Sequence, residues 1–540
     1  MMESYNLILN QDDARRKVKE GINKATELVA PTLGATSRRI LLDKEYGEMN
    51  ACDDGTTILN DISIEDTQIN MGIKVVREAS GKTNVDEGDG TTTTAVILNA
   101  LVNKLLAETK ESKDDELDFT KGSKNNLKLR QDIKVGLEKV INYINENKIE
   151  VTTKEQIAQI GRVSANSQEI GDLLADMFEK LGKEGAIAVE EGKSVSTEYE
   201  IIPGMSSGNG WVAQEFVTNV KTEEAILDGE EKPISVLVST TKIVNADQVK
   251  KLVELFEGGA TNLLIIADDI SGAPLQSLVI NKMRQVLKVV AVKAPQVGNQ
   301  AEFLRDICAV TGAQLVGPGG DTTFENMSIA NLGKAKKAIV TNNKTIIIGL
   351  GDNAQIEERV AVLNNRLEKE ESDYEAKTLK ERISKLRGGV GNIKVGGSTP
   401  LEIKDKKTKV VDAVSAVKSA LLGGVVDGGG IALLGAAQIL DDNIEGEKVL
   451  KSAIQVPFEL IMANADINKG PVKEKYLETG EGLNVETGET GNLIEMGIID
   501  PANVVKAALT NAVSNALMVS NLGGAVALVR SDDKEDDIKM

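Results

Sequence analysis

Histidine is absent from this sequence of 540 residues, and cysteine and the aromatic residues are scarce. Without histidine, a Ser-His-Asp triad and a histidine-ligated metal are excluded, so any proton transfer falls to carboxylates. The two cysteines, Cys52 and Cys308, provide neither a disulfide framework nor the spacing of a zinc site, which indicates a reducing, cytoplasmic setting. Because aromatics are only 3% of the residues, the core must be built from Val, Ile, Leu and Ala.

Long apolar segments and an excess of positive charge are lacking too. The first eleven residues have no signal-peptide pattern, and apolar runs such as 286–292 are short and interrupted by Lys288, so no membrane span is expected. A net charge of −20 argues against a general binder of nucleic acid or anionic membranes. The composition that remains, 41% hydrophobic and 27% charged, is globular, and the length suggests about three domains.

Residues 85–98 combine glycine, acidic and hydroxyl residues directly before an apolar helical run. Gly88 and Gly90 permit a positive φ and let a ligand approach the main chain, and the threonines 91–94 would cap a helix whose free N–H groups attract phosphate. Asp89 could hold the magnesium ion of a nucleotide, because hard cations prefer oxygen ligands. The alternative is a glycine-rich turn with a threonine cap and no ligand.

Two other ligand loops fail on spacing. A calcium loop would need Glu where Ala95 or Ile97 stands, and a Walker loop ending at Thr83 would need Gly where Val76 stands. A second glycine loop at 423–430 also precedes a helix, and two such loops favour a nucleotide cradle more than either alone.

The rest of the chain alternates between helical and mixed patterns. Apolar spacing predicts helices at 12–30, 95–106 and 133–144, a charged insertion at 110–126, and a helix that opens at Asp412. Between 196 and 380, β-branched strands separated by helices indicate an α/β insert that includes a charged helix pair at 355–386. Apolar stripes on its helices near Val253 and Val279 are explained mainly by core packing, with an exposed binding face as the alternative.

Ten motifs occur in the same order as in the group I chaperonins, the GroEL-like ring proteins, which this chain resembles over nearly its whole length. They are Thr32-Leu33-Gly34, Asp54-Gly55, Gly88 to Thr93, Ser164 to Ser167, Leu263 to Asp269, Val292 to Pro295, Ser372-Asp373-Tyr374, Gly388-Gly389-Val390, Gly428-Gly429-Gly430 and Met496 to Pro501. The resemblance implies an α+β multidomain chain. It implies a mainly α-helical equatorial ATPase domain (1–150 and 423–540), a small intermediate domain (151–203 and 390–422) and an inserted α/β apical domain (204–389).

The resemblance also implies an ATP site, carried over residue by residue. The phosphate cradle would be Thr32, Leu33, Gly34, Gly88, Asp89, Gly90, Thr91, Thr92 and Thr93, with Asp89 as the Mg²⁺ ligand. A potassium-like site would be Thr32, Asp53 and Thr92, and the adenosine pocket would be Gly429, Asn484, Val485, Ile498 and Asp500, where Asp500 accepts from ribose hydroxyls. Asp412 matches the family's catalytic carboxylate, which would orient and deprotonate the attacking water with Asp54 as a second carboxylate.

The partners implied are non-native polypeptides, further copies of the chain in a ring of seven, and a co-chaperonin lid. Clients would be captured on apolar apical residues, namely Trp211, Val212, Phe216, Val253, Leu275, Val279 and Ile280. No nucleic acid or membrane partner is expected. The resulting interpretation is an ATP-driven folding chaperonin, and the alternative is a passive holdase or structural ring without productive turnover.

Several positions depart from the family pattern. The cradle turn reads Gly34-Ala35-Thr36-Ser37 in place of the usual Gly-Pro-Lys-Gly, and Asp427 replaces a small apolar residue before the triple glycine. Lys250 and Glu215 make the client face more polar, and Asn209 with Pro400 replaces a charged pair between subunits. The charged segment 110–126 is longer than usual, and an acidic tail at 531–540 replaces the Gly-Gly-Met tail.

Overall fold

The computed structural model describes residues 4–43, 49–108, 123–183, 185–192, 194–219, 223–229, 232–295, 300–370 and 372–530. These form two compact units, which are described separately. Unit 1 contains residues 1–175 and 399–540, and unit 2 contains residues 176–398. The multidomain α+β class is confirmed. Within the intermediate domain expected at 151–203 and 390–422, two helices fall in unit 1 and three strands fall in unit 2, so that finer division stays a prediction.

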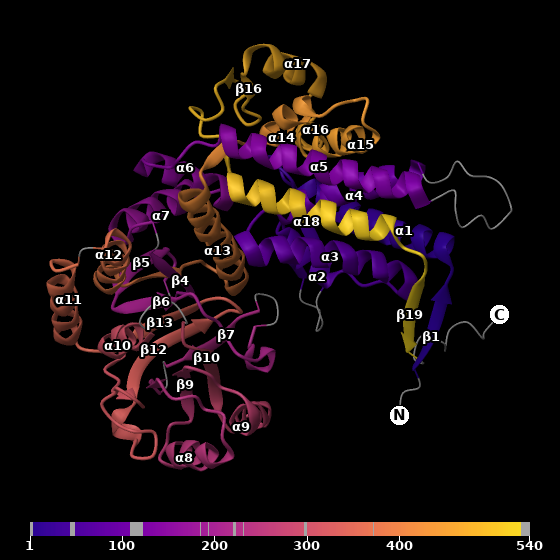
Figure 1. Ribbon diagram of the computed structural model, residues 1–540. Helices are drawn as coiled ribbons and strands as arrows, with labels where there is room; N and C mark the ends of the chain where they lie inside the picture. Colours follow the sequence, from indigo (N-terminus) through magenta and orange to yellow (C-terminus); the bar gives the residue numbers. More distant parts are fainter. Residues whose placement is uncertain are drawn as a thin grey trace. The chain divides into compact units, whose positions relative to one another are not determined.

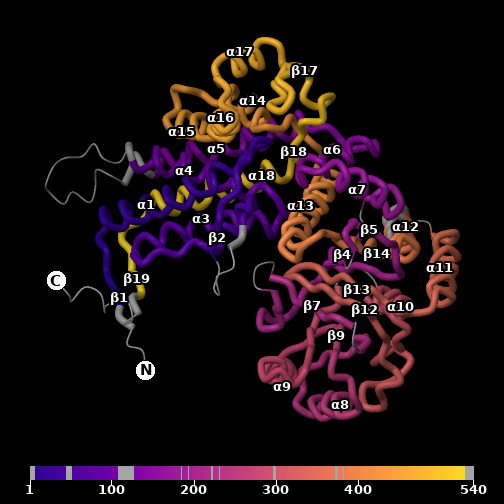
Figure 2. Tube along the Cα trace, turned by 180° about the vertical axis from the view of Figure 1, so that it is seen from behind, coloured from indigo at the N-terminus to yellow at the C-terminus, as the bar shows by residue number. Residues whose placement is uncertain are grey.

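Unit 1 is mainly helical. Its helices are α1 (Gln11–Val29), α2 (Gly55–Asp61), α3 (Thr67–Glu87), α4 (Thr91–Glu108), α5 (Ser123–Asn147), α6 (Lys154–Ala165), α13 (Pro400–Gly423), α14 (Ile431–Ala436), α15 (Glu445–Ile454), α16 (Val456–Asn464), α17 (Lys469–Thr479) and α18 (Ala502–Ser520), and α7 (Gln168–Leu181) runs across the boundary into unit 2. The long helices α1, α3, α4, α5 and α18 lie side by side (Figures 1 and 2) and enclose an aliphatic core. Both ends of the chain therefore build one body.

Unit 1 also has short two-stranded sheets, all antiparallel. They pair β1 (Ser4–Leu9) with β19 (Ala525–Arg530), β2 (Ile40–Asp43) with β3 (Met49–Cys52), β15 (Val425–Asp427) with β18 (Ile499–Pro501), and β16 (Gly482–Leu483) with β17 (Thr490–Gly491). The β15 and β18 pair sets Val426 opposite Asp500. This pairing joins the second glycine loop to the motif 496–501.

Unit 2 is built around an eight-stranded mixed sheet. Its path is β10 (Lys288–Lys293), β9 (Asn262–Ala267), β8 (Ile234–Ser239), β12 (Gly333–Val340), β13 (Thr345–Gly349) and β6 (Gly204–Ser207), with β11 (Leu315–Val316) paired to β8 and β7 (Ala225–Asp228) paired to β12. Strands β8, β9 and β10 are parallel, and α8 (Ala246–Glu257) and α9 (Gly272–Met283) connect them in turn. A second sheet has the order β4 (Ala186–Glu191), β14 (Val390–Val395), β5 (Glu198–Ile202).

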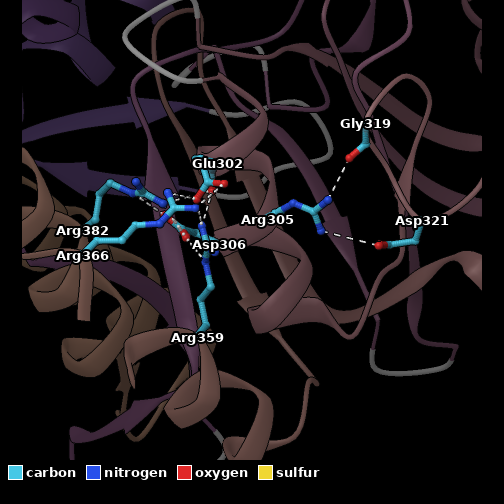
Figure 3. A network of polar contacts seen from close by, with 8 residues as sticks. All are labelled: Glu302, Arg305, Asp306, Gly319, Asp321, Arg359, Arg366 and Arg382. Carbon is cyan, nitrogen blue, oxygen red and sulfur yellow. Dashed lines mark hydrogen bonds and ion pairs between the residues drawn. The ribbon is translucent and has the colours of Figure 1, made fainter. Parts of the chain in front are cut away.

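Ion pairs connect the remaining helices of unit 2. They are α10 (Gln300–Thr311), α11 (Asn353–Leu367) and α12 (Asp373–Gly388). The nearly inaccessible Asp306 on α10 accepts from Arg359 Nε at 2.8 Å, from Arg382 Nε at 2.7 Å and from Arg382 Nη2 at 2.9 Å (Figure 3). Glu302, one turn earlier, pairs with Arg359 and Arg366, each at 2.8 Å. We call Glu302, Asp306, Arg359, Arg366 and Arg382 the arginine network.

Most of the elements expected from apolar spacing are present. The expected helices at 12–30, 95–106 and 133–144, the α/β insert and the charged helix pair all form. Of the expected insertion at 110–126, residues 110–122 lie outside the part of the chain that the structure describes. The tail at 531–540 lies outside it as well. In the part of the chain that the structure describes, no helix has the length and apolar character needed to span a membrane.

Two local expectations are wrong. Asp412 does not open a helix, because α13 starts twelve residues earlier, where the Thr399 side chain accepts from Glu402 N and Pro400 occupies the first turn. The apolar stripe begins only near Asp412 because the first part of α13 is not buried. Threonines 91–94 do not cap α4 either. They form its first turn, and the Gly90 carbonyl accepts from Thr94 N.

Candidate functional site

The loop between α3 and α4 has the backbone that its glycines predicted. Gly88 ends α3 with φ of 73°, and Gly90 has φ of 81°. Between them, Asp89 Oδ1 accepts from Gly90 N at 2.6 Å and Oδ2 accepts from Ser164 Oγ at 3.3 Å. Burial first, and then the charge of Asp54, raises the pKa of Asp89. The loop thus presents a carboxylate whose two hydrogen-bond partners are neutral.

Gly88 is also required by packing. A Cβ at this position would lie 2.2 Å from Cβ of Ser415, a residue of α13. The adjacent Glu87 accepts from Ser419 Oγ, one turn further along α13, at 2.7 Å. The glycine therefore lets α13 cross close to the Asp89 loop.

Asp54 has a structural role beside its predicted catalytic one. It is the N-cap of α2, where its carboxylate accepts from Thr56 N at 3.2 Å and from Thr57 N at 2.7 Å. The adjacent Thr56 hydroxyl is buried and, among the described residues, has no hydrogen-bond partner. The cap fixes the orientation of the Asp54 carboxylate, and that carboxylate retains lone pairs for water or a cation.

Asp412 meets Asp54 and Asp89 from the middle of α13. Burial, followed by the charges of Asp54, Asp89 and Asp53, raises the pKa of Asp412 well above its usual value, and Lys409 opposes this shift. We call Asp54, Asp89, Asp412 and Asp500 the carboxylate cluster. The expected convergence of Asp54, Asp89 and Asp412 is therefore present in unit 1.

Asp500 lies on β18 beside the second glycine loop. Its carboxylate accepts from Gly429 N, and burial, with the charges of Asp89 and Asp427, raises its pKa to about 7. Gly429 has φ of 66°, and a Cβ added to it would meet no atom within 4 Å. Asp427, one of the departures from the family pattern, accepts a hydrogen bond from the Tyr476 hydroxyl, and burial raises its pKa. Gly429 and Asp500 therefore lie together next to open space.

Three of the predicted nucleotide residues contact one small apolar cluster. Leu33, Val485 and Ile498 come from separate segments and pack against Ile431, Leu434, Phe458, Ile461, Met462 and Leu493. Gly34 has φ of 96°, and a Cβ there would contact the Ile461 side chain at 3.1 Å. Asn484 Oδ1 accepts from Glu486 N at 2.9 Å, which holds the turn that carries Val485. An apolar surface thus lies beside Gly34 and the second glycine loop.

The residues of the expected potassium-like site are only partly brought together. The buried hydroxyls of Thr32 and Thr92 lie 3.3 Å apart, and Thr32 Oγ1 donates to Val29 O at 2.8 Å. Asp53 Oδ2, in contrast, accepts from Lys409 Nζ at 3.1 Å, so that oxygen already has a cationic partner. Thr91 is buried like Thr92, and Thr93 is half-buried.

The carboxylate cluster fits a nucleotide-bound Mg²⁺ better than a metal held by protein alone. Within the described ranges, no group of three or more Cys, Asp or Glu side chains could hold a metal ion by itself. Burial first, and then neighbouring acids, raise the pKa of Asp89 and Asp412, so a cation next to them would offset an unfavourable charge. When bound, a magnesium ion would supply positive charge next to the phosphates, with Asp89 as its protein ligand.

The predicted client residues lie in unit 2 and differ in exposure. On α8 and α9, Val253 and Ile280 are exposed, and Leu275 and Val279 are half-buried at the edge of the core, as are Trp211 and Val212. The prediction that Phe216 contacts clients is wrong. Its side chain is 0% exposed within the core of unit 2 and cannot contact a client there. As the core alternative required, Leu252 and Leu278 are buried.

Sequence reasoning gave no role to several residues that contact the site. Ser164 donates to Asp89, Ser415 packs on Gly88, and Lys409 and Arg39 pair with Asp53. Ser164 lies in a motif that had been noted without a function. Lys409 could have been found from its spacing, because it lies three residues before Asp412 on one helical face.

Comparisons with known proteins agree with this arrangement. Residues 25–520 match the model of the TCP-1/cpn60 chaperonin family. A similar solved structure is the chaperonin gp146 from the bacteriophage EL 2 (Pseudomonas aeruginosa) in the presence of ATP-BeFx, crystal form II, with 20% identity, a TM-score of 0.66, and coverage of 97% of this chain and 99% of that one. Crystal form I of the same protein gives 19% identity and a TM-score of 0.61 at the same coverage. This chain therefore belongs to the TCP-1/cpn60 chaperonin family, as a divergent, GroEL-like member.

Proposed function

We propose that this protein is an ATP-driven ring chaperonin, which captures non-native polypeptides on apolar surface of unit 2 and hydrolyses ATP at the carboxylate cluster of unit 1. The observation that carries the proposal is the convergence of Asp54, Asp89 and Asp412 beside two glycine loops. Family membership supports it, and so does the ATP-BeFx present with the related phage chaperonin.

In the proposed site, each group has one task. The Gly88 to Thr93 loop, together with Thr32, Leu33 and Gly34, holds the phosphates, and Asp89 binds Mg²⁺. Asp412 orients the attacking water and accepts its proton, a role supported by a raised pKa that brings the carboxylate nearer to neutral pH. Asp54 orients the same water, while its hydrogen bonds to α2 keep it in place.

The adenosine would bind against the apolar cluster. Its base would contact Val485 and Ile498 next to Asn484, and Asp500 would accept from the ribose hydroxyls beside Gly429. Packing of Val485 and Ile498 on one cluster supports this assignment. K⁺ is proposed at the Thr32 and Thr92 hydroxyls with Asp53.

Self-association has a candidate surface in unit 1. The two-stranded sheet of β1 and β19 exposes the apolar side chains of Ile8, Val526 and Leu528. An isolated two-stranded sheet is marginally stable, so a further copy that covers it would stabilise both. This supports a homo-oligomeric ring, for which seven subunits, a co-chaperonin lid and a cytoplasmic location are the family expectation.

Steady-state ATP hydrolysis by the wild type and Asp412→Ala tests the enzymatic half. The variant should still bind ATP but turn over at least about 10²-fold more slowly, the usual effect of losing a general base. Asp442→Ala, which removes an exposed carboxylate of unit 1, is the matched control and should hydrolyse ATP normally. Hydrolysis by Asp412→Ala at the wild-type rate would remove Asp412 from the mechanism. A wild type that captures clients without hydrolysing ATP would favour the passive holdase.

Client capture is tested on α9. Val279→Glu should abolish retention of an unfolded protein, because a charge at the apolar patch opposes hydrophobic contact, and should leave ATP hydrolysis nearly unchanged. Val362→Glu places the same charge at an exposed valine of α11 and is the control. Undiminished capture by Val279→Glu would assign this patch to the core. Electron micrographs with and without ATP would give the ring number.

A further inference from the structure

Four charged side chains form a closed ring next to the carboxylate cluster in unit 1. Arg39 Nη2 lies 3.2 Å from Asp405 Oδ2, Lys409 Nζ lies 3.8 Å from the same Asp405 oxygen and 3.1 Å from Asp53 Oδ2, and Arg39 Nε lies 4.0 Å from Asp53 Oδ2. The charges alternate around the ring, so each carboxylate has two basic neighbours. We call these residues the four-charge ring.

The ring joins the two segments that carry the proposed catalytic carboxylates. Asp53 directly precedes Asp54, and Lys409 lies one turn before Asp412 on the same face of α13. Arg39 directly precedes β2, on the other side of the short hairpin that ends at Cys52. The ring therefore connects α13 to the chain on both sides of the β2 and β3 hairpin.

Apolar packing anchors only the second half of α13. Among residues 400–409, all of which the structure describes, none is buried, and Leu401 is exposed. From Val410 onward the buried residues are Val410, Ala413, Val414, Ala416, Val417, Ser419, Ala420 and Gly423. Asp412 lies near the start of the anchored part, and the adjacent part of the helix is connected to residues 39–53 by charge.

The two ion pairs of Lys409 are partly shielded from water, whereas the Arg39 side chain is half-exposed, at 51%. The side chains of Asp53, Asp405 and Lys409 are about one-fifth exposed, at 21%, 22% and 20%. Shielded pairs with several partners are weakened by solvent and salt less than single exposed pairs. The ring is thus suited to fixing the orientation of α13.

We propose that Arg39 and Lys409 are positioning residues for ATP hydrolysis, because their ion pairs with Asp405 and Asp53 hold the first half of α13 and so fix the Asp412 carboxylate at the reacting water. This rests on the proposed function. Neither basic residue takes part in the chemistry. Their removal allows the helix to shift, and small displacements of a catalytic group are costly.

Steady-state hydrolysis, together with binding of a non-hydrolysable ATP analogue, tests the proposal on the full chain. Lys409→Met should lower kcat about 10-fold while the dissociation constant of the analogue changes less than about twofold, because positioning acts on the reacting geometry. Lys409→Arg keeps the charge and should retain most of the rate. Lys406→Met removes the same charge from the same helix, but Lys406 pairs with Glu402 within α13, so the rate should be unchanged.

The second basic residue provides the second arm. Arg39→Asp should lower kcat, and Arg39→Lys should retain most of the rate, because lysine keeps a positive charge next to Asp405 and Asp53. This arm decides the question if Lys409→Met does not fold. Unchanged kcat in Lys409→Met and Arg39→Asp, or analogue binding that weakens in parallel with kcat, would overturn the proposal. A wild type without ATP hydrolysis would instead overturn the proposed function.

Discussion

The carboxylate cluster of unit 1 and the arginine network of unit 2 both contain shielded acidic groups, but in the described part of the chain only those of the arginine network form ion pairs with basic side chains, and the pKa shifts at the two sites have opposite directions. In the arginine network, Asp306 receives three hydrogen bonds from two guanidinium groups. Burial alone would raise the pKa of Glu302, but Arg359 and Arg366 lower it. In the carboxylate cluster, burial and neighbouring acids raise the pKa of Asp89, Asp412 and Asp500.

This difference separates structure from function. Removing a charge from water is costly, and in unit 2 arginines from two other helices compensate for it within the fold. In unit 1 the compensation is incomplete, because the carboxylates repel one another and the hydrogen-bond donors to Asp89 are neutral. A fold retains such an arrangement where a ligand supplies the missing charge, which supports the nucleotide site that we propose at this cluster.

The largest expected effect is at Asp306. Asp306→Asn removes the charge and leaves Arg359 and Arg382 without it, so the unfolding free energy of unit 2 should fall by about 3–5 kcal/mol. Trp211, the one tryptophan of the chain, lies in unit 2 and reports its unfolding by fluorescence during a urea titration. Asp321→Asn is the control, because Asp321 pairs with the partly exposed Arg305 at 3.5 Å and should cost less than about 1 kcal/mol. An unchanged urea midpoint for Asp306→Asn would show that the arginine network does not stabilise unit 2, and the contrast with the carboxylate cluster would then fail.

An Asp→Asn substitution in the carboxylate cluster of unit 1 should raise the free energy of unfolding rather than lower it. Asp412→Asn removes one of several repelling carboxylates, so it should stabilise unit 1 by about 1 kcal/mol while ATP hydrolysis is lost. Calorimetry without nucleotide measures the stability, and the Trp211 transition should not move. Asp442→Asn, at an exposed ion pair, should leave both unchanged. Destabilisation by Asp412→Asn would mean that the cluster is compensated after all.

A further expected effect is a pH dependence of stability from Asp500. Its pKa is raised from 3.8 to about 7 in the folded state, so between these values the folded chain binds a proton that the unfolded chain does not. The stability contributed by this proton is complete below pH about 4 and is lost as the pH rises through about 7. Asp500→Asn should therefore flatten part of the decline in melting temperature over this range. An identical pH profile in the variant would show that Asp500 titrates normally.

Elements and motifs were the predictable part of this molecule. Apolar spacing located the long helices, and positive φ at Gly88 and Gly90 followed from glycine between polar residues. The start of α13 was missed because its first half is not buried and has no apolar stripe, although Thr399 and Pro400 are a start signal. Phe216 was misassigned because it was carried over from the family resemblance, and a matching position does not show whether an aromatic side chain lies in the core or beside it.

Composition and motifs already narrowed the chemistry open to this protein: without histidine, carboxylates are the main candidates for a general base, and glycine before a helix favours phosphate binding. Tertiary structure alone decided which charges face one another. Asp53 pairs with Lys409, and Asp306 pairs with Arg382, because segments distant in sequence pack together. Local patterns encode the period of an element but not its partner, so the four-charge ring and the arginine network became visible only in the folded units.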